Sequence, residues 1–273
     1  MNQKLRIASF NIRYDSKGID PSPRATNEGF IINQKLEKRQ AKEQPWNIRK
    51  YKVADTILFH KIDVIGIQEA IYSQIKDLES LLAKNNDDDW GWVGVGRHDG
   101  KPDGNEGGEF TPIFYNKNRL KLLDFEHFWL SETPNVPNSM GWDAKLTRVV
   151  TQARFQNLQT NLTFYHINTH FDHLGIKARS ERDKTKNDLK MEAFVDTRYK
   201  ISGEGKESYG HSNTFTGFNA DVEHVRIDFI LVHQQSLTGD NIKIINHGVM
   251  ENQYDDGLYI SDHRPVIADI LFI

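Results

Sequence analysis

Short apolar runs with the residue pattern of β-strands recur along the chain, and this feature most narrows the folds open to it. Leu5–Asn11 alternates between apolar and polar residues, and Val64–Ile67 and Val266–Phe272 are almost continuously apolar. Alternation indicates a strand with one buried face, and a short continuous run indicates a strand buried on both faces. Trp46–His60 and Ile71–Leu82 instead place apolar residues near helical spacing. Many strands with a few helices predict a layered α/β or α+β fold.

Further strands are expected at Trp92–Val95, Pro112–Tyr115, Lys121–Trp129, Val149–Phe155, Thr163–Asn168 and Val225–Val232. No linker rich in proline, glycine or serine divides the 273 residues. We therefore expect one domain that covers residues 1–273. Asp15–Glu43 is polar and weakly patterned, which is typical of a long surface insertion.

Composition removes several classes of function. The chain has no cysteine, which excludes disulfides, thiolate catalysis and cysteine-ligated zinc. Its formal net charge of −3 gives no overall basic field, which weakens a nucleic-acid function without excluding it. No run approaches the length of a transmembrane helix, and Met1–Phe10 lacks the apolar core of a signal peptide. A cytoplasmic protein without membrane contact is expected.

Polar residues fall at the ends of the expected strands. Asn11, Glu69, His170 and the pair Asp262-His263 each lie next to an apolar run, and Asp228 lies inside one. Strand ends in a packed sheet can bring such residues into one crevice. The pattern therefore predicts a polar site at one edge of the sheet.

Each of these residues also has an ordinary structural explanation. Asn11 could cap a turn, and Glu69 could begin the following helix, where the helix dipole favours a carboxylate. His170 could be a loop histidine. Asp228 is harder to explain in this way, because an acid within an apolar strand is costly to bury without a partner. A salt bridge with Arg226 or another neighbour would be the structural alternative.

Taken together, the set combines hard oxygen ligands with histidine. Carboxylates suit Mg²⁺, which prefers oxygen and keeps several of its waters. Cleavage of a phosphoester requires a cation on the phosphate oxygens, a nucleophilic water and an acid for the leaving group. The sequence has no HExxH or HxxxH helix for zinc, no Gly-x-Ser-x-Gly elbow and no GxxxxGK[ST] loop. These absences favour phosphoester chemistry over the other hydrolase classes.

The order of the motifs resembles that of one family, the endonuclease/exonuclease/phosphatase superfamily, which includes DNase I-like nucleases and inositol-phosphate phosphatases. The resemblance spans nearly the whole chain, and its motifs are Phe10-Asn11-Ile12-Arg13, Ile67-Gln68-Glu69, Pro112-Ile113-Phe114-Tyr115, Asn168-Thr169-His170-Phe171-Asp172-His173, Arg226-Ile227-Asp228 and Ser261-Asp262-His263-Arg264-Pro265. Two further motifs resemble a largely uncharacterised bacterial and fungal subgroup: Ser131-Glu132-Thr133-Pro134 and Gly141-Trp142-Asp143-Ala144. The resemblance implies a four-layered α/β sandwich, in which two packed mixed β-sheets are flanked by helices.

The resemblance also implies roles for individual residues. Glu69 would be the main Mg²⁺ ligand with Asn11 assisting, and Mn²⁺ could substitute for Mg²⁺. His170 would contact the scissile phosphate or protonate the leaving group, and Tyr115 would also reach the phosphate. Asp228 would orient a catalytic group or lie close to the metal.

His263, held by Asp262, would bind phosphate or position the water. The expected substrate is a phosphomonoester or phosphodiester, either a small molecule or a nucleic acid, and the protein is expected to be a monomer. The candidate substrate-binding residues are Asn11, Arg13, Asn168, Trp142 and Arg148, with Trp46 and Arg49 as further candidates. Packing or surface salt bridges would be the alternative roles of the tryptophans, Arg49 and Arg148.

One motif of the superfamily is missing. A Gly-Asp-x-Asn motif, whose Asp activates the water, is expected between the motifs of His170 and Asp228. The chain instead reads Lys184–Leu189, which contains no apolar strand, and continues into Phe194–Arg198, which resembles the segment after the motif. A helix and a strand need about 20 residues, so we expect one central strand and its helix to be absent. Phe218–Asp221 resembles the motif only superficially, because no apolar strand precedes it.

The missing motif leaves two functions open. Loss of the group that activates the water typically lowers the rate of such an enzyme by orders of magnitude. The chain is therefore either a metal-dependent phosphoesterase that uses another residue for this step, or a catalytically impaired pseudoenzyme that acts as a binding module.

Overall fold

The computed structural model describes residues 3–15, 43–83, 89–104, 107–172, 193–218 and 222–273. Some of the sequence expectations concern residues outside these ranges. They are most of the surface insertion at 16–42, His173, the segment 184–189 and residues 219–221.

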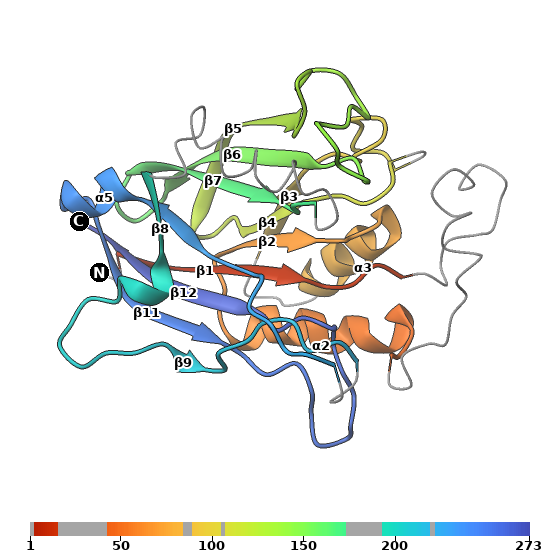
Figure 1. Cartoon of the computed structure of the whole chain (residues 1–273). Coiled ribbons are helices and arrows are strands. Elements are labelled where there is room, and N and C mark those ends of the chain that lie inside the picture. Colours follow the sequence, from red (N-terminus) through yellow and green to blue (C-terminus); the bar gives the residue numbers. More distant parts are fainter. Residues whose placement is uncertain (1–2, 16–42, 84–88, 105–106, 173–192, 219–221) are drawn as a thin grey trace, which may run out of the picture.

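A seven-stranded mixed sheet forms the centre of the fold, in the order β3-β4-β2-β1-β12-β11-β9. Its strands are β1 (Lys4–Asn11), β2 (Val64–Gln68), β3 (Trp90–Val93), β4 (Ile113–Asn116), β9 (Tyr209–Gly210), β11 (Ile242–Val249) and β12 (Val266–Phe272). β1 runs parallel to β2 and antiparallel to β12. The first and last long strands of the chain are therefore neighbours in the middle of the sheet (Figure 1).

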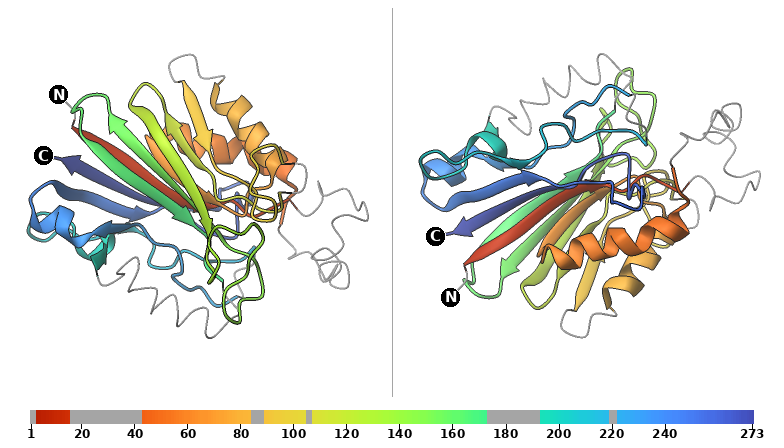
Figure 2. Two further views of the ribbon diagram at one scale, coloured as in Figure 1. Left: turned by 90° about the horizontal axis from the view of Figure 1, so that it is seen from above. Right: turned by 90° about the horizontal axis from the view of Figure 1, so that it is seen from below.

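Two smaller sheets complete the β-structure. One is the antiparallel sheet of β5 (Leu120–Trp129), β6 (Val149–Asn157) and β7 (Thr163–Thr169), and the other pairs β8 (Phe194–Asp196) with β10 (Leu231–His233). A 3-10 turn, η4 (Thr197–Tyr199), follows β8, and the short helix α5 (Gln234–Thr238) follows β10. The long helices α2 (Trp46–Phe59) and α3 (Tyr72–Ala83) lie side by side on one face of the seven-stranded sheet (Figure 2).

The two faces of β1 explain how the layers pack. Leu5 and Ile7 point to one face, where they join Phe155 of the β5-β6-β7 sheet in an apolar cluster. Phe10 points to the opposite face and packs with Ile57 of α2. Because side chains alternate across a strand, one sequence supplies the contacts between the sheets and the contacts with the helices. The predicted α/β sandwich of two packed sheets is confirmed.

The strand expected at Val225–Val232 is largely wrong. Only Leu231–His233 forms a strand. The backbone N–H groups of Ile227 and Asp228 donate to the Thr214 hydroxyl at 3.0 Å, so this segment is held by a side chain instead of a neighbouring strand. The sequence analysis also missed β11, since a bulge between Ile244 and Asn246 interrupts its alternation.

The β5-β6-β7 and β8-β10 sheets are not joined to each other. Within the described ranges, no strand pairs with both β7 and β10, so none bridges these two sheets. Tyr165 of β7 is 60% exposed, and Ile167, two residues on, is also exposed. The expected absence of a central strand stays a prediction, because residues 173–192 lie outside the described ranges. Among the described residues, no helix is long and apolar enough to cross a membrane.

Candidate active site

Asn11 and Glu69 meet where the parallel strands β1 and β2 end. Asn11 is in register with Gln68, so Glu69 is the first residue beyond the paired region. Asn11 Nδ2 donates to Glu69 Oε1 at 2.9 Å. Glu69 has a left-handed backbone with φ of 61°, a conformation that non-glycine residues adopt rarely and often at functional sites. The strand ends therefore place a carboxylate and an amide together, as the sequence predicted.

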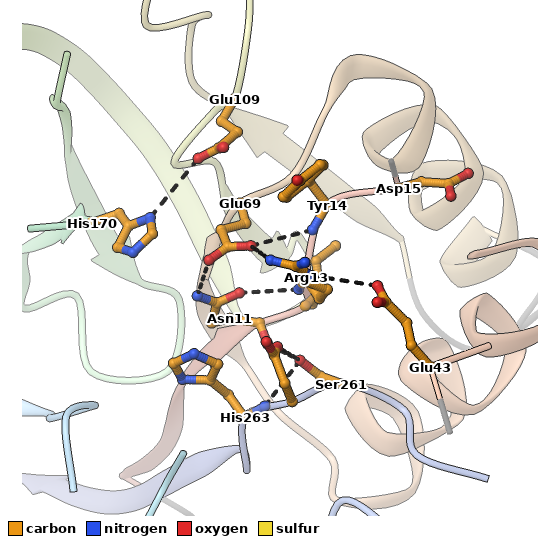
Figure 3. A network of polar contacts seen from close by, with 12 residues as sticks. Asn11, Arg13, Tyr14, Asp15, Glu43, Glu69, Glu109, His170, Ser261 and His263 are labelled. Carbon is orange, nitrogen blue, oxygen red and sulfur yellow. Dashed lines mark hydrogen bonds and ion pairs between the residues drawn. The ribbon is translucent and has the colours of Figure 1, made fainter. Parts of the chain in front are cut away.

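The second oxygen of Glu69 faces cationic and backbone donors. Arg13 Nη1 lies 3.7 Å from Glu69 Oε2, and the Tyr14 N–H donates to the same oxygen at 3.4 Å (Figure 3). Burial by itself would raise the pKa of Glu69, but the Arg13 guanidinium and the hydrogen bond from Asn11 lower it. Glu69 is therefore held as a carboxylate.

His170 follows β7 and lies on the opposite side of Glu69 from Arg13 (Figure 3). Its Nδ1 is 2.9 Å from Arg148 Nη1 and 3.9 Å from Glu109 Oε2. Burial, and then the positive charge of Arg148, lower the pKa of His170 to about 3. His170 is therefore a neutral imidazole at pH 7. Glu109 is bound more closely by Arg97, at 2.9 Å.

His263 has the opposite electrostatic environment. Its Nδ1 is 2.8 Å from Asp228 Oδ2, and its side chain is nearly buried. Burial lowers the pKa of His263, but Asp228 outweighs this effect and raises it to about 9. The site therefore combines one neutral histidine with one imidazolium.

The carboxylate that holds His263 is Asp228 and not Asp262, which corrects the sequence expectation. Asp262 Oδ1 accepts from the Ser261 hydroxyl at 3.2 Å, and burial raises the pKa of Asp262. Adjacent residues on an extended chain point in different directions, so the sequence neighbour of a histidine is poorly placed to orient its ring. The structural alternative, a salt bridge between Asp228 and Arg226, is not among the described contacts, in which Arg226 pairs with Asp196.

Tyr115 is not brought to the site. It is in register with Val64 at the start of β2, so it lies about 16 Å along the sheet from Glu69 at about 3.3 Å per residue. Its ring packs against Phe155 with ring centroids 4.9 Å apart. The position places Tyr115 in the apolar core between the two sheets.

Asn168 forms a link between the two sheets. Its Nδ2 donates to the carbonyl oxygens of Ile67 and Pro112 at 2.7 and 2.9 Å, and its Oδ1 accepts from Gln68 at 2.7 Å. The residue is only 4% exposed. These contacts give it a structural role and do not support the expectation that it binds substrate.

The remaining candidates for substrate contact are Trp142, Trp46 and Arg49. Trp142 lies in the loop before β6, where its backbone N–H donates to Glu132. Trp46 and Arg49 are buried, and Arg49 Nη1 donates to the carbonyl oxygens of Ile12 and Ile260 at 2.7 Å. The packing roles of Trp46 and Arg49 therefore match the structural alternative.

Three residues of the site were not found from the sequence: Arg97, Glu109 and Ser261. Arg97 and Glu109 flank a loop rich in glycine and aspartate, and no spacing distinguishes them from other loop charges. Ser261 was visible within its motif, but its hydrogen bond to the Asn11 carbonyl at 2.6 Å joins residues 250 positions apart. Only the closure of β1 against the segment before β12 reveals that contact.

No model of a protein family matches the chain, and a search of curated proteins gives no match either. Solved structures do match over nearly all of its length. An endonuclease/exonuclease/phosphatase from Bacteroides vulgatus has 27% identity and a TM-score of 0.73, with 99% of both chains covered. A family protein from Bacteroides thetaiotaomicron has 25% identity and a TM-score of 0.74, with 100% of this chain and 99% of the other covered.

The fold is that of the endonuclease/exonuclease/phosphatase superfamily. A mannosyl-6-phosphatase from Bacteroides thetaiotaomicron is also similar, with 25% identity, a TM-score of 0.72, and 98% of this chain and 100% of the other covered. The superfamily fold is a phosphoesterase fold, and the strand-end residues Asn11, Glu69, His170 and His263 lie together in it.

Proposed function

We propose that the protein is a metal-dependent phosphoesterase that hydrolyses a phosphomonoester or a phosphodiester with Mg²⁺ as cofactor. The observation that carries this proposal is the partly buried carboxylate of Glu69, which is hydrogen-bonded to Asn11 and lies in the same site as a neutral histidine and an imidazolium. Such a set can hold a cation on one side of a phosphate and donate hydrogen bonds to its oxygens.

The donor set fits Mg²⁺ better than other metals. Mg²⁺ is typically bound by one or two carboxylates together with substrate phosphate and water. Glu69 supplies a carboxylate and Asn11 an amide oxygen. Within the described ranges, no three histidine, cysteine, aspartate or glutamate residues form a group that could hold a metal. An all-protein cage of the kind that binds structural zinc is therefore not part of the described site.

The contacts of the site residues support a role for each of them. Glu69 and Asn11 would hold the cation, which when bound polarises the phosphoryl oxygens. The imidazolium of His263, oriented by Asp228, would bind a phosphate oxygen through its Nε2–H. His170 faces the same region from the other side. Arg13 keeps the carboxylate of Glu69 charged. When the cation binds, it would either displace the Arg13 guanidinium from this carboxylate or share the carboxylate with it.

A second function is favoured by one observation. The described residues include no strand that joins the β5-β6-β7 sheet to the β8-β10 sheet, and the sequence contains no Gly-Asp-x-Asn motif. A protein that lacks this motif can retain the anion-binding groups and lose turnover. The competing proposal is therefore a pseudoenzyme that binds phosphate esters.

Hydrolysis assays separate these functions. The substrates are p-nitrophenyl phosphate, mannose 6-phosphate and bis-p-nitrophenyl phosphate, each with Mg²⁺, with Mn²⁺ and with EDTA. Metal-dependent turnover that is lost in Glu69→Gln and retained in Glu126→Gln, an exposed residue of β5, supports the enzyme. The first two substrates report monoesterase activity and the third reports diesterase activity.

Absence of turnover from a protein that melts cooperatively overturns the enzyme proposal. Binding of Mg²⁺ and inorganic phosphate by that protein, measured by calorimetry, then supports the pseudoenzyme. If neither turnover nor binding is observed, both proposals are wrong.

A further inference from the structure

The two histidines of the site have partners of opposite charge. His263 Nδ1 faces the carboxylate of Asp228 at 2.8 Å, whereas His170 Nδ1 faces the guanidinium of Arg148 at 2.9 Å. A carboxylate only accepts hydrogen bonds and a guanidinium only donates them. The two rings must therefore carry their protons on different atoms.

The proton position of His170 follows from its partner. Arginine remains charged in proteins and has no acceptor atom, so at 2.9 Å Arg148 Nη1 donates and His170 Nδ1 accepts. A neutral imidazole that accepts at Nδ1 carries its proton on Nε2. Donation from Nδ1 to Glu109 would give the other tautomer, but the 3.9 Å separation is too long for a hydrogen bond.

Arg148 is itself held firmly in place. Its side chain is 4% exposed, and its Nε lies 3.9 Å from Oδ1 of Asp172, which is equally buried. It directly precedes β6, and the Leu130 N–H donates to its backbone carbonyl at 2.9 Å. Glu109, the carboxylate nearest to His170 Nδ1, is bound by Arg97 at 2.9 Å. The surroundings therefore fix the guanidinium against the ring and keep the competing carboxylate occupied.

We propose that Arg148 is a positioning residue that locks His170 as the neutral Nε2–H tautomer, so that His170 donates a hydrogen bond to a substrate oxygen and is not the acid that protonates the leaving group. The proposal rests on the proposed function for its substrate, because the oxygen is that of a phosphate ester. It replaces the expectation that Arg148 contacts substrate. It also leaves His263 as the cationic histidine of the pair.

The tautomer can be observed directly in protein labelled with ¹⁵N-histidine. The chain contains 11 histidines, and His170→Gln identifies the resonances of His170 by their loss. In the wild type at pH 7, His170 is expected to show an unprotonated Nδ1 and a protonated Nε2. Arg148→Lys, which keeps a cationic donor, is expected to retain this state.

Arg148→Met is expected to change the state of His170, because the ring loses its donor and Glu109 becomes its nearest charged neighbour. Protonation should then appear at Nδ1. Arg119→Met serves as the matched control, since Arg119 is a partly buried arginine paired with Asp63 at 3.0 Å and should leave His170 unchanged. A wild-type His170 protonated at Nδ1, or an Arg148→Met variant that melts cooperatively with His170 unaltered, overturns the proposal. If Arg148→Met does not fold, the wild-type and Arg148→Lys spectra still decide it.

Activity provides a second, separable readout. If the wild type turns over phosphate esters, Arg148→Met should lower kcat by about 10²-fold, as loss of a positioned hydrogen-bond donor to a developing oxyanion typically does, with KM little changed. Arg148→Lys should recover part of that loss. Absence of wild-type turnover would count against the proposed function alone, because the spectra test the tautomer without substrate.

Discussion

The pairing of Asp228 with His263 leads to a stability prediction that depends on pH. The change is Asp228→Asn, which removes the negative charge and keeps the size of the side chain. Asp228 raises the pKa of His263 to about 9 from its ordinary value of 6.5, although burial alone would lower it. In the variant, the pKa of His263 should fall well below 9, because Asp228 raises it more than Asp262 and Glu69 do.

The magnitude follows from proton linkage. A histidine with a raised pKa binds its proton more tightly in the folded state, so its contribution is complete below pH 6.5 and is lost as the pH rises through about 9. At about 1.4 kcal/mol per pKa unit, the raised pKa of His263, to which Asp228 contributes most, stabilises the fold by up to about 3 kcal/mol at pH 6 and about 2 kcal/mol at pH 7.5. Almost nothing remains at pH 9.5. In a protein of this size, 2 kcal/mol corresponds to roughly 4–8 °C in Tm.

Urea unfolding, followed by the fluorescence of the five tryptophans, measures this difference. Wild type and variant are compared at pH 6, 7.5 and 9.5 in EDTA, so that metal binding does not add to stability. Asp124→Asn is the control, because Asp124 pairs with Arg154 at the exposed surface and should have a much smaller effect. A difference between wild type and Asp228→Asn that is equal at pH 6 and pH 9.5 would refute the reasoning.

Three further predictions concern other parts of the fold. Burial lowers the pKa of His247 to about 4, so the wild type should lose about 2–3 kcal/mol of stability as the pH falls from 7 to 4.5. His247→Gln should abolish this loss, which is measured by the Tm of both proteins as a function of pH. Asp269, almost fully buried, accepts from Arg6 Nε at 2.7 Å, and Asp269→Asn should cost about 3 kcal/mol in urea unfolding, with a cost under 1 kcal/mol contradicting a stabilising role. Gly96→Ala would place a Cβ 2.2 Å from the Cα of Gly107, and we expect a loss of about 2 kcal/mol or more; unchanged Tm would show that the two loops separate freely.

The regular elements were largely predictable because their signals are local. The helix expected at Trp46–His60 is found at Trp46–Phe59, and the strand expected at Val266–Phe272 has those bounds. Apolar periodicity reports which face of a segment is buried, and this requires no knowledge of the neighbouring elements. The strand expected at Val225–Val232 was largely wrong because a local pattern does not show whether a neighbouring strand is present. A strand requires such a neighbour with which to pair.

Four residues of the site could be predicted from the sequence: Asn11, Glu69, His170 and His263. Each lies at or near the end of a strand, and strand ends at the same edge of a sheet lie close together. The placement of Tyr115 was not predictable. Its motif is adjacent to a strand, but the antiparallel register of β4 on β2 carries its side chain away from the site.

The sequence by itself determined the α/β class, the order of the motifs and the absence of the Gly-Asp-x-Asn motif. Only the tertiary structure decided that His263 is held by Asp228, that His170 accepts from Arg148, and that one histidine is charged and the other neutral. The physical reason is that protonation depends on the charges within a few ångströms of a ring. Arg148 is 22 positions and Asp228 35 positions from the ring each one contacts, so sequence distance carries no information about those charges.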